Sequence, residues 1–261
     1  VAGAQLLTPR VEPIAGDLIE GEAREAVRRR LQDFVRNEVE RRLAPLFAAS
    51  SLELGGAARG LVFQLTTALG CLPRLEVGRQ VAALDPMDRA ALSRIGVRFG
   101  TESVYFEQLL RVETQRFRAL LWAVRHGRSP PPLPSARRLA RPIEIDPVFP
   151  ESFYATIGFR VMGGLAVRPD RLERLAAAAR RSARGGPFSA GPELASIAAV
   201  PIPMMHRLLE ALGYRPVSDA AGETTFIAKP RRRREISNGR VRRERSGQSH
   251  PFAKLRELKL A

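Results

Sequence analysis

Apolar residues recur at helical spacing along most of the chain, so the sequence predicts a mainly α-helical protein. The longest such stretch runs from Glu22 to Ala49. Shorter stretches with the same spacing predict further helices at Ala57–Leu72, Glu76–Leu84, Asp85–Ile95, Glu113–Arg125, Pro150–Ile157 and Asp170–Arg184. Asp85 and Pro86 supply an N-cap and a first-turn proline for one of them.

Short β-hairpins interrupt the helical pattern. Residues 159–167 read FRVMGGLAV, two apolar runs around paired glycines, which is typical of a hairpin. Val97–Phe106 alternates poorly, and we expect short strands or irregular structure there. The last part resembles a winged helix, with helices expected at Glu193–Ala198 and Pro203–Leu212 and strands at Tyr214–Val217 and Thr224–Ala228. The predicted fold class is therefore mainly α with small β-hairpins (α+β).

Proline and glycine stretches divide the chain into parts. Residues 129–134 read SPPPLP and residues 185–192 read GGPFSAGP. We predict a helical domain at 1–128, a proline-rich connector at 129–149, a helix-hairpin-helix unit at 150–184, a linker at 185–192, a winged-helix-like part at 193–228, a disordered basic tail at 229–249 and a short apolar terminal segment at 250–261. The chain starts with Val1 and not with Met, so we expect a fragment or a processed piece.

A short motif occurs three times. Ile95–Arg98, Ile157–Arg160 and Leu212–Arg215 each place an apolar residue, glycine, an apolar residue and arginine after a predicted helix. Glycine is a common helix stop, so we interpret the motif as helix, glycine cap and strand. A functional interpretation would require Arg98, Arg160 and Arg215 to share one surface.

The net charge indicates a polyanionic partner. The chain has 43 Lys and Arg against 27 Asp and Glu, a formal charge of +16, and arginine dominates. The guanidinium fork matches phosphate oxygens, and neutralising phosphates releases counterions. The alternative is a genome rich in G and C, which inflates Arg, Ala, Gly and Pro together; the chain would then be a structural or protein-interaction module.

The densest charge lies near the C-terminus. Nine basic residues against two acidic ones leave +7 between residues 229 and 245. We expect this segment to be disordered on its own and to bind RNA phosphates without sequence preference, because it holds no aromatic residue for base stacking. The predicted binding residues are Lys229, Arg231, Arg232, Arg233, Arg234, Arg240, Arg242, Arg243 and Arg245. A solubilising tail and a targeting signal are the alternatives.

Beyond this run, Phe252, Leu255 and Leu258 would form one apolar helical stripe. Such a stripe after a polar segment predicts docking, either on the body of the protein itself or in the groove of a protein partner.

The sequence contains no recognisable catalytic motif. It lacks a phosphate-binding loop and a nucleophile elbow, and His126, His206 and His250 lack the spacing of a zinc site. We therefore predict no catalytic residue, no metal and no cofactor for this chain, although an enzyme of unrecognised type is a third alternative. Cys71 has apolar neighbours and is expected to be a buried structural thiol, and no stretch reads as a membrane span or a signal peptide. We expect a cytoplasmic protein.

Several strings together resemble the C-terminal accessory region of bacterial relatives of the mitochondrial degradosome RNA helicase, a superfamily-two DExH family. They are IGVRFGTESVYFEQLL at 95–110, ALLWAVRHG at 119–127, FYATIGFRVMGGLAVRPDRLERL at 153–175, LLEALGYRP at 208–216 and HPFAKL at 250–255. The resemblance covers most of the chain from Glu22 onward, and none of the strings is a catalytic motif.

The resemblance implies a function without chemistry in this chain. In that family the ATP-binding loop and the DExH strand lie in upstream motor domains. The chain would then flank helicase motor domains in cis or in trans, help to form the RNA exit channel and hold the strand by backbone contacts. No specific binding residue is carried over, because no nucleic-acid motif of the family matches position by position.

Overall fold

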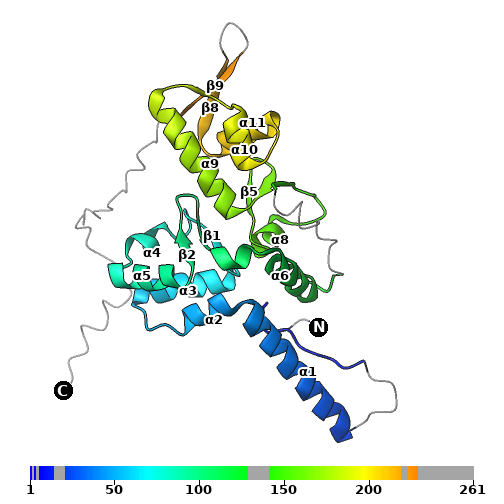
Figure 1. Ribbon diagram of the computed structural model, residues 1–261. Helices are drawn as coiled ribbons and strands as arrows, with labels where there is room; N and C mark the ends of the chain where they lie inside the picture. The colour runs from blue at the N-terminus through cyan, green and yellow to red at the C-terminus, as the bar shows by residue number, and fades with distance from the viewer. Residues whose placement is uncertain (2, 4–5, 15–20, 129–140, 219–222, 229–261) are drawn as a thin grey trace, which may run out of the picture. The chain divides into compact units, whose positions relative to one another are not determined.

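A computed structural model describes residues 1, 3, 6–14, 21–128, 141–218 and 223–228 (Figure 1). The described residues form one compact unit. The predicted fold class is confirmed: the chain is mainly helical, with small antiparallel sheets.

The N-terminal helix is shorter than predicted. The expected single helix at Glu22–Ala49 is two helices, α1 (Gly21–Arg42) and α2 (Ala44–Ser50). Pro45 lies in the first turn of α2, where its missing N–H needs no partner, whereas within a continuous helix its ring would clash with the preceding turn. Leu43 leaves the helical conformation with φ −115° and ψ 25°, and the single-helix prediction is therefore wrong.

After α2, the described residues form three successive units, each with a three-stranded antiparallel sheet, which we call repeats. The first repeat follows α2. Its elements are α3 (Gly56–Thr67), β1 (Cys71–Pro73), α4 (Gly78–Ala82), α5 (Pro86–Arg94), β2 (Val97–Phe99) and β3 (Ser103–Phe106). The strands form an antiparallel sheet in the order β1-β3-β2. The predicted helix at Ala57–Leu72 was too long, because Leu69 and Gly70 both adopt positive φ and turn the chain into β1.

The second repeat has the same order of strands, and its described residues hold one helix fewer than the first repeat. Its elements are the 3-10 turn η1 (Glu107–Leu110), α6 (Val112–Arg125), β4 (Ile143–Glu144), α8 (Glu151–Thr156), β5 (Arg160–Met162) and β6 (Leu165–Val167). The sheet order is β4-β6-β5. The predicted hairpin at 159–167 is confirmed, with Gly163 and Gly164 both at positive φ in its turn.

The third repeat completes the described chain. Its elements are α9 (Pro169–Ser182), the 3-10 turn η2 (Ala183–Gly185), β7 (Phe188–Ser189), α10 (Pro192–Ala198), α11 (Ile202–Ala211), β8 (Tyr214–Ser218) and β9 (Thr224–Ala228). The sheet order is β7-β9-β8, and the helix-turn-helix followed by a hairpin has the order of a winged helix. The segment 185–192, predicted as a linker, contributes β7 to this sheet.

The repeated motif marks the same point in all three repeats. Gly96, Gly158 and Gly213 have φ of 95°, 88° and 94°, and each turns the chain from a helix into the first strand of a hairpin. Glycine adopts this conformation without steric cost, which explains why it recurs. The three arginines that follow lie in three separate sheets, where Arg98 and Arg215 are exposed and Arg160 is half-buried.

The buried side chains form three main clusters, one centred on each repeat, and the first and third clusters also include residues of neighbouring elements, among them Leu121 of α6 and Leu165 of β6. Leu61, Leu65, Leu92 and Phe106 belong to the first core. Trp122, Phe153 and Phe159 belong to the second core, where the rings of Trp122 and Phe153 pack edge to face with their centres 4.9 Å apart. Leu172, Leu175, Leu208, Leu209 and Phe226 belong to the third. Helix α9 therefore shares a core with α10, α11 and the last sheet.

Arg118 of α6 connects η1 with α8 inside the second repeat. Its side chain is fully buried, its Nε donates to the carbonyl of Thr156 at 2.6 Å, and its Nη1 donates to the carbonyl of Leu109 at 3.1 Å. These carbonyls belong to the last turns of α8 and η1, where carbonyl groups lack partners within the helix and the helix end carries partial negative charge. Burial lowers the pKa of Arg118 to about 10, so the guanidinium is still charged at neutral pH.

Cys71 is buried at the start of β1, as predicted. Burial in apolar surroundings raises the pKa of its thiol to about 11, because the thiolate is disfavoured away from water. The thiol is therefore unreactive in the folded protein.

Candidate nucleic-acid interface

The binding residues predicted from the sequence lie outside the described residues. This holds for the basic run from Lys229 to Arg245 and for the apolar stripe Phe252, Leu255 and Leu258. These predictions stay predictions, as does the proline-rich connector up to residue 140. The candidate site below is built from residues 141–218 alone.

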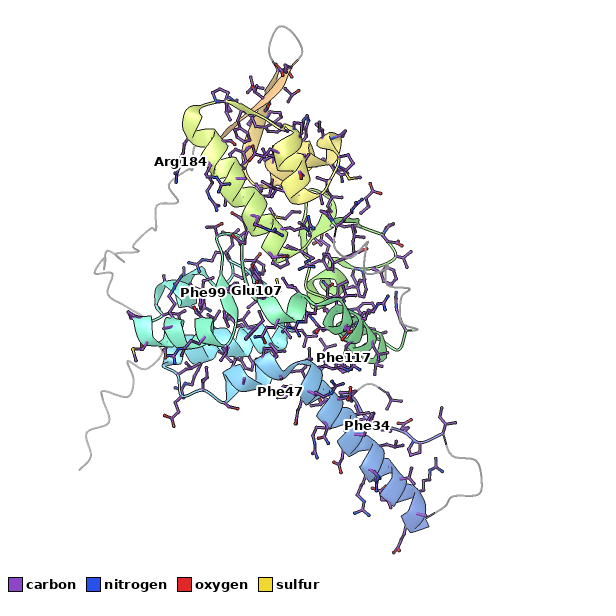
Figure 2. All side chains as sticks on the ribbon, viewed as in Figure 1. Phe34, Phe47, Phe99, Glu107, Phe117 and Arg184 are labelled. Atoms are coloured by element: carbon purple, nitrogen blue, oxygen red, sulfur yellow. The ribbon has the colours of Figure 1, made fainter. Side chains whose placement is uncertain are left out.

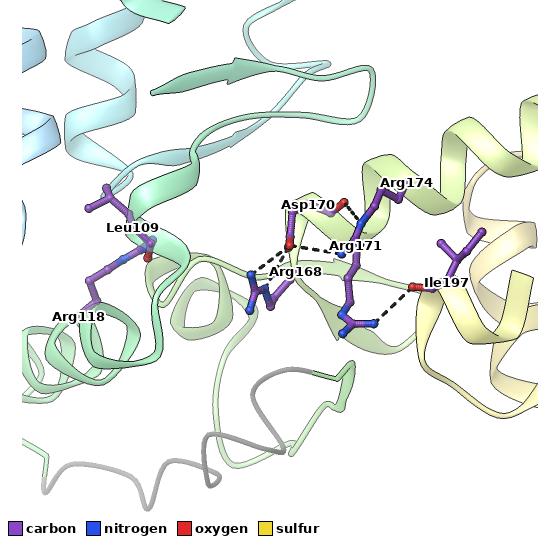
Figure 3. Close-up of polar contacts among 7 residues, drawn as sticks. All are labelled: Leu109, Arg118, Arg168, Asp170, Arg171, Arg174 and Ile197. Carbon is purple, nitrogen blue, oxygen red and sulfur yellow. Dashed lines mark hydrogen bonds and ion pairs between the residues drawn. The ribbon is translucent and has the colours of Figure 1, made fainter. Parts of the chain in front are cut away.

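Four arginines gather where the second repeat meets the third. We call Arg141, Arg168, Arg171 and Arg174 the arginine cluster. Arg168 and Arg174 form ion pairs with Asp170, and the charge of Arg141 acts on Arg171; Figure 3 labels Asp170 with Arg168, Arg171 and Arg174. Arg168 is the N-cap residue of α9, while Arg171 and Arg174 lie one turn apart on that helix. Arg141 comes from the chain just before β4. The local formal charge of the five side chains is +3.

Asp170 holds two of the four arginines. The Nε and Nη2 atoms of Arg168 donate to its two carboxylate oxygens, each at 3.0 Å, in a bidentate pair. The Nη2 atom of Arg174 lies 3.7 Å from Oδ2 of Asp170, and two thirds of the Arg174 side chain is exposed. Asp170 lies in the first turn of α9, where a carboxylate also interacts favourably with the helix dipole. The single carboxylate of Asp170 therefore compensates only part of the positive charge of the arginine cluster.

Arg171 reaches from α9 to α10 within the third repeat. Its Nη1 donates to the carbonyl of Ile197 near the end of α10, at 3.4 Å (Figure 3). Partial burial lowers the pKa of Arg171, and the positive charges of Arg174, Arg168 and Arg141 lower it further while Asp170 raises it. These four guanidinium groups therefore repel one another, which is the electrostatic condition for attracting an anion.

A surface hollow adjoins the cluster. It has a volume of about 610 Å³ and is lined by Arg141, the second half of α10, the turn after it and the start of α11. Ala199 makes that turn in the left-handed conformation, with φ 56°. In a helix-turn-helix the second helix is the one that approaches nucleic acid. The hollow therefore lies between the start of α11 and the exposed Arg141.

A second surface is apolar. Helix α1 buries only Val39, whereas Phe34 is 62% exposed and Val27 and Leu31 are about 40% exposed. Phe34 and the α6 residues Phe117 and Leu120 line a groove of about 620 Å³ between the two helices; Figure 2 labels both phenylalanines. The helical periodicity of α1 thus marks a face that the described residues leave largely uncovered.

Two other features are absent from the part of the chain that the structure describes. There, no group of three or more His, Cys, Asp or Glu side chains could hold a metal ion. Within the same residues, no helix is long and apolar enough to cross a membrane.

Sequence reasoning missed the arginine cluster. RPDRLER at 168–174 reads as an ordinary amphipathic helix start, and Arg141 lies 27 residues before it along the chain. No family model, curated protein or solved structure matches this chain.

Proposed function

We propose that the chain is a non-catalytic accessory module of an ATP-dependent RNA helicase, and that it binds RNA through backbone phosphates. The observation that carries RNA binding is the arginine cluster, because its four guanidinium groups outnumber the carboxylate of Asp170 and adjoin the helix-turn-helix of the third repeat. Guanidinium groups bind phosphate oxygens with paired hydrogen bonds and remain charged under all physiological conditions.

The chemistry of the cluster favours binding without sequence preference. Phosphate contacts position a protein on nucleic acid but carry no base information. No aromatic side chain belongs to the cluster, so base stacking does not add specificity. The basic run from Lys229 to Arg245 would add further phosphate contacts of the same kind.

The helicase part of the proposal rests on the resemblance of the strings between residues 95 and 255. ATP binding and hydrolysis would be supplied by motor domains, in cis or in trans, and the module would hold the strand beside them. A cytoplasmic location, where a lone reduced thiol such as Cys71 is expected, is part of the same proposal.

Removing two exposed arginines of the cluster should weaken RNA binding. In the double variant Arg141→Ala/Arg174→Ala we expect affinity for single-stranded RNA to fall about tenfold at 150 mM salt. The slope of log K against log salt should become shallower by about 2, since two phosphate contacts are lost. Fluorescence anisotropy at several salt concentrations measures both quantities.

The matched control is Arg24→Ala/Arg29→Ala, which removes the same charge from the exposed face of α1. An equal loss of affinity in the two double variants would show that only net charge matters and would remove the cluster as the site.

The apolar groove between α1 and α6 favours a second function, docking of a protein partner. For Phe34→Asp we expect loss of partner proteins in a pull-down, because a carboxylate would enter the apolar groove, while RNA affinity changes less than about twofold. The pull-down is repeated after nuclease treatment. If nuclease treatment by itself removes the partner proteins from the pull-down, RNA links them to the chain, and direct docking in the groove is contradicted.

A further inference from the structure

The turn between β2 and β3 is held by a carboxylate from another repeat. The Oε1 atom of Glu173, on α9, accepts the backbone N–H groups of Glu102 and Ser103, each at 2.8 Å. Its Oε2 atom accepts the N–H of Thr101 at 2.8 Å and the hydroxyl of Thr101 at 3.0 Å. Four donors therefore converge on one carboxylate that lies about 70 residues further along the chain.

This arrangement is an oxyanion nest. Three successive backbone N–H groups that point at one spot form the type of concavity that binds phosphate and sulfate in proteins. Gly100 permits the close approach, because a Cβ atom there would lie 2.1 Å from Oε1 of Glu173. The turn is thus shaped for an oxyanion at the position that the carboxylate fills.

The nest has more donors and positive charge than a carboxylate uses. Arg180 donates to the hydroxyl of Thr101 at 2.8 Å and lies 3.6 Å from Glu102. Arg74 donates its backbone N–H to the carbonyl of Glu102, and its guanidinium interacts electrostatically with Glu173. The buried Nη1 of Arg74 and Oγ of the fully buried Ser103 have no hydrogen-bond partner among the described residues.

The corresponding turn of the second repeat has no such nest. Gly163 and Gly164 pack against Arg207 of α11, and a Cβ at Gly163 would lie 2.6 Å from the backbone carbonyl oxygen of Arg207. That turn therefore contacts a carbonyl and a guanidinium, and neither of these groups is an anion. The carboxylate in the first turn is specific to the pairing of β2–β3 with α9.

We propose that the β2–β3 turn is a phosphate-binding site, and that Glu173 occupies it in place of a phosphate group until one competes. A phosphate has more oxygens and more negative charge than a carboxylate, so it can accept more hydrogen bonds and interact more strongly with the guanidinium of Arg74, which already interacts with Glu173. The phosphate comes either from the RNA backbone, which rests on the proposed function, or from free phosphate in solution, and the experiment separates the two.

The test uses the full chain with Glu173→Ala, which empties the nest, and Glu173→Gln, which keeps the shape of the side chain and removes its charge. Glu53→Ala is the matched control, since it removes an exposed acid elsewhere. Inorganic phosphate is titrated while the amide resonances of Thr101, Glu102 and Ser103 are followed by NMR. We expect saturable shifts in both Glu173 variants at phosphate concentrations about tenfold lower than in the wild type, with Glu53→Ala like the wild type.

The second arm measures single-stranded RNA. If RNA is the source, Glu173→Ala binds about threefold or more tightly than Glu53→Ala, and its salt slope is steeper by about 1. Phosphate shifts without a gain in RNA affinity support the site and assign it to free phosphate. The proposal is overturned if the turn amides of both variants respond to phosphate no better than those of the wild type. Far-UV circular dichroism checks that Glu173→Gln is folded. RNA binding that is missing even in the wild type overturns the proposed function and leaves the phosphate result standing.

Discussion

Arg118→Ala is expected to lower the free energy of unfolding by about 3–5 kcal/mol, as urea denaturation at pH 7 would show. The substitution leaves a cavity in the core and removes the donors of the carbonyls of Thr156 and Leu109. Those carbonyls end α8 and η1 and would remain buried without partners. Because they belong to η1 and α8, the connection of both elements to α6 should weaken as well.

Arg118→Met separates the lost volume from the lost hydrogen bonds. Methionine fills most of the space and removes a buried cation whose pKa is already lowered by burial, so we expect a smaller loss, about 1–3 kcal/mol. Arg116→Ala, at an exposed position of α6, should change stability by less than about 0.5 kcal/mol. A loss for Arg118→Ala that is no larger than for Arg116→Ala would contradict the structural role of Arg118.

Ending the chain at Ala228 is expected to weaken RNA binding about 100-fold at 150 mM salt. The removed segment begins with the basic run from Lys229 to Arg245, which holds nine basic residues and has a local charge of +7. Each lost phosphate contact should also make the salt dependence shallower by about 1. Affinity measured between 50 and 300 mM salt gives both values, and circular dichroism checks that the shortened chain is folded.

A chain that ends at Gln248 is the control, because it lacks the apolar stripe but keeps the basic run. It should bind RNA like the full chain. If the arginine cluster supplies the RNA affinity that remains in the chain ending at Ala228, adding Arg141→Ala/Arg174→Ala to that shortened chain should abolish it. A flat salt response, or equal affinity with and without residues 229–248, would exclude a role for the basic run.

Local sequence signals predicted the hairpins of the second and third repeats well. Paired glycines set the turn at Gly163 and Gly164, and strand Thr224–Ala228 was predicted to the residue. The break before α2 was also readable, since Pro45 is a helix-breaking signal that the longer apolar periodicity obscured. Strands β1, β4 and β7 were missed, because two or three residues carry no periodicity and their partner strands are distant in sequence.

The candidate sites show the same limit. The arginine cluster depends on Arg141 reaching the start of α9, and the nest depends on Glu173 meeting a turn 70 to 72 residues earlier. Neither contact leaves a local signal. Arg118 looks like any helix arginine in the sequence, although it is fully buried.

By itself the sequence determined the mainly helical class, the glycine turns of the three repeats and the concentration of charge after Ala228, because backbone preference, periodicity and composition are local properties. The tertiary structure alone decided that the three motifs begin the hairpins of three similar repeats, that Arg141 acts on the arginines at the start of α9, and that Glu173 fills the turn of another repeat. Those arrangements depend on which faces pack together, and packing joins residues that no spacing along the chain relates.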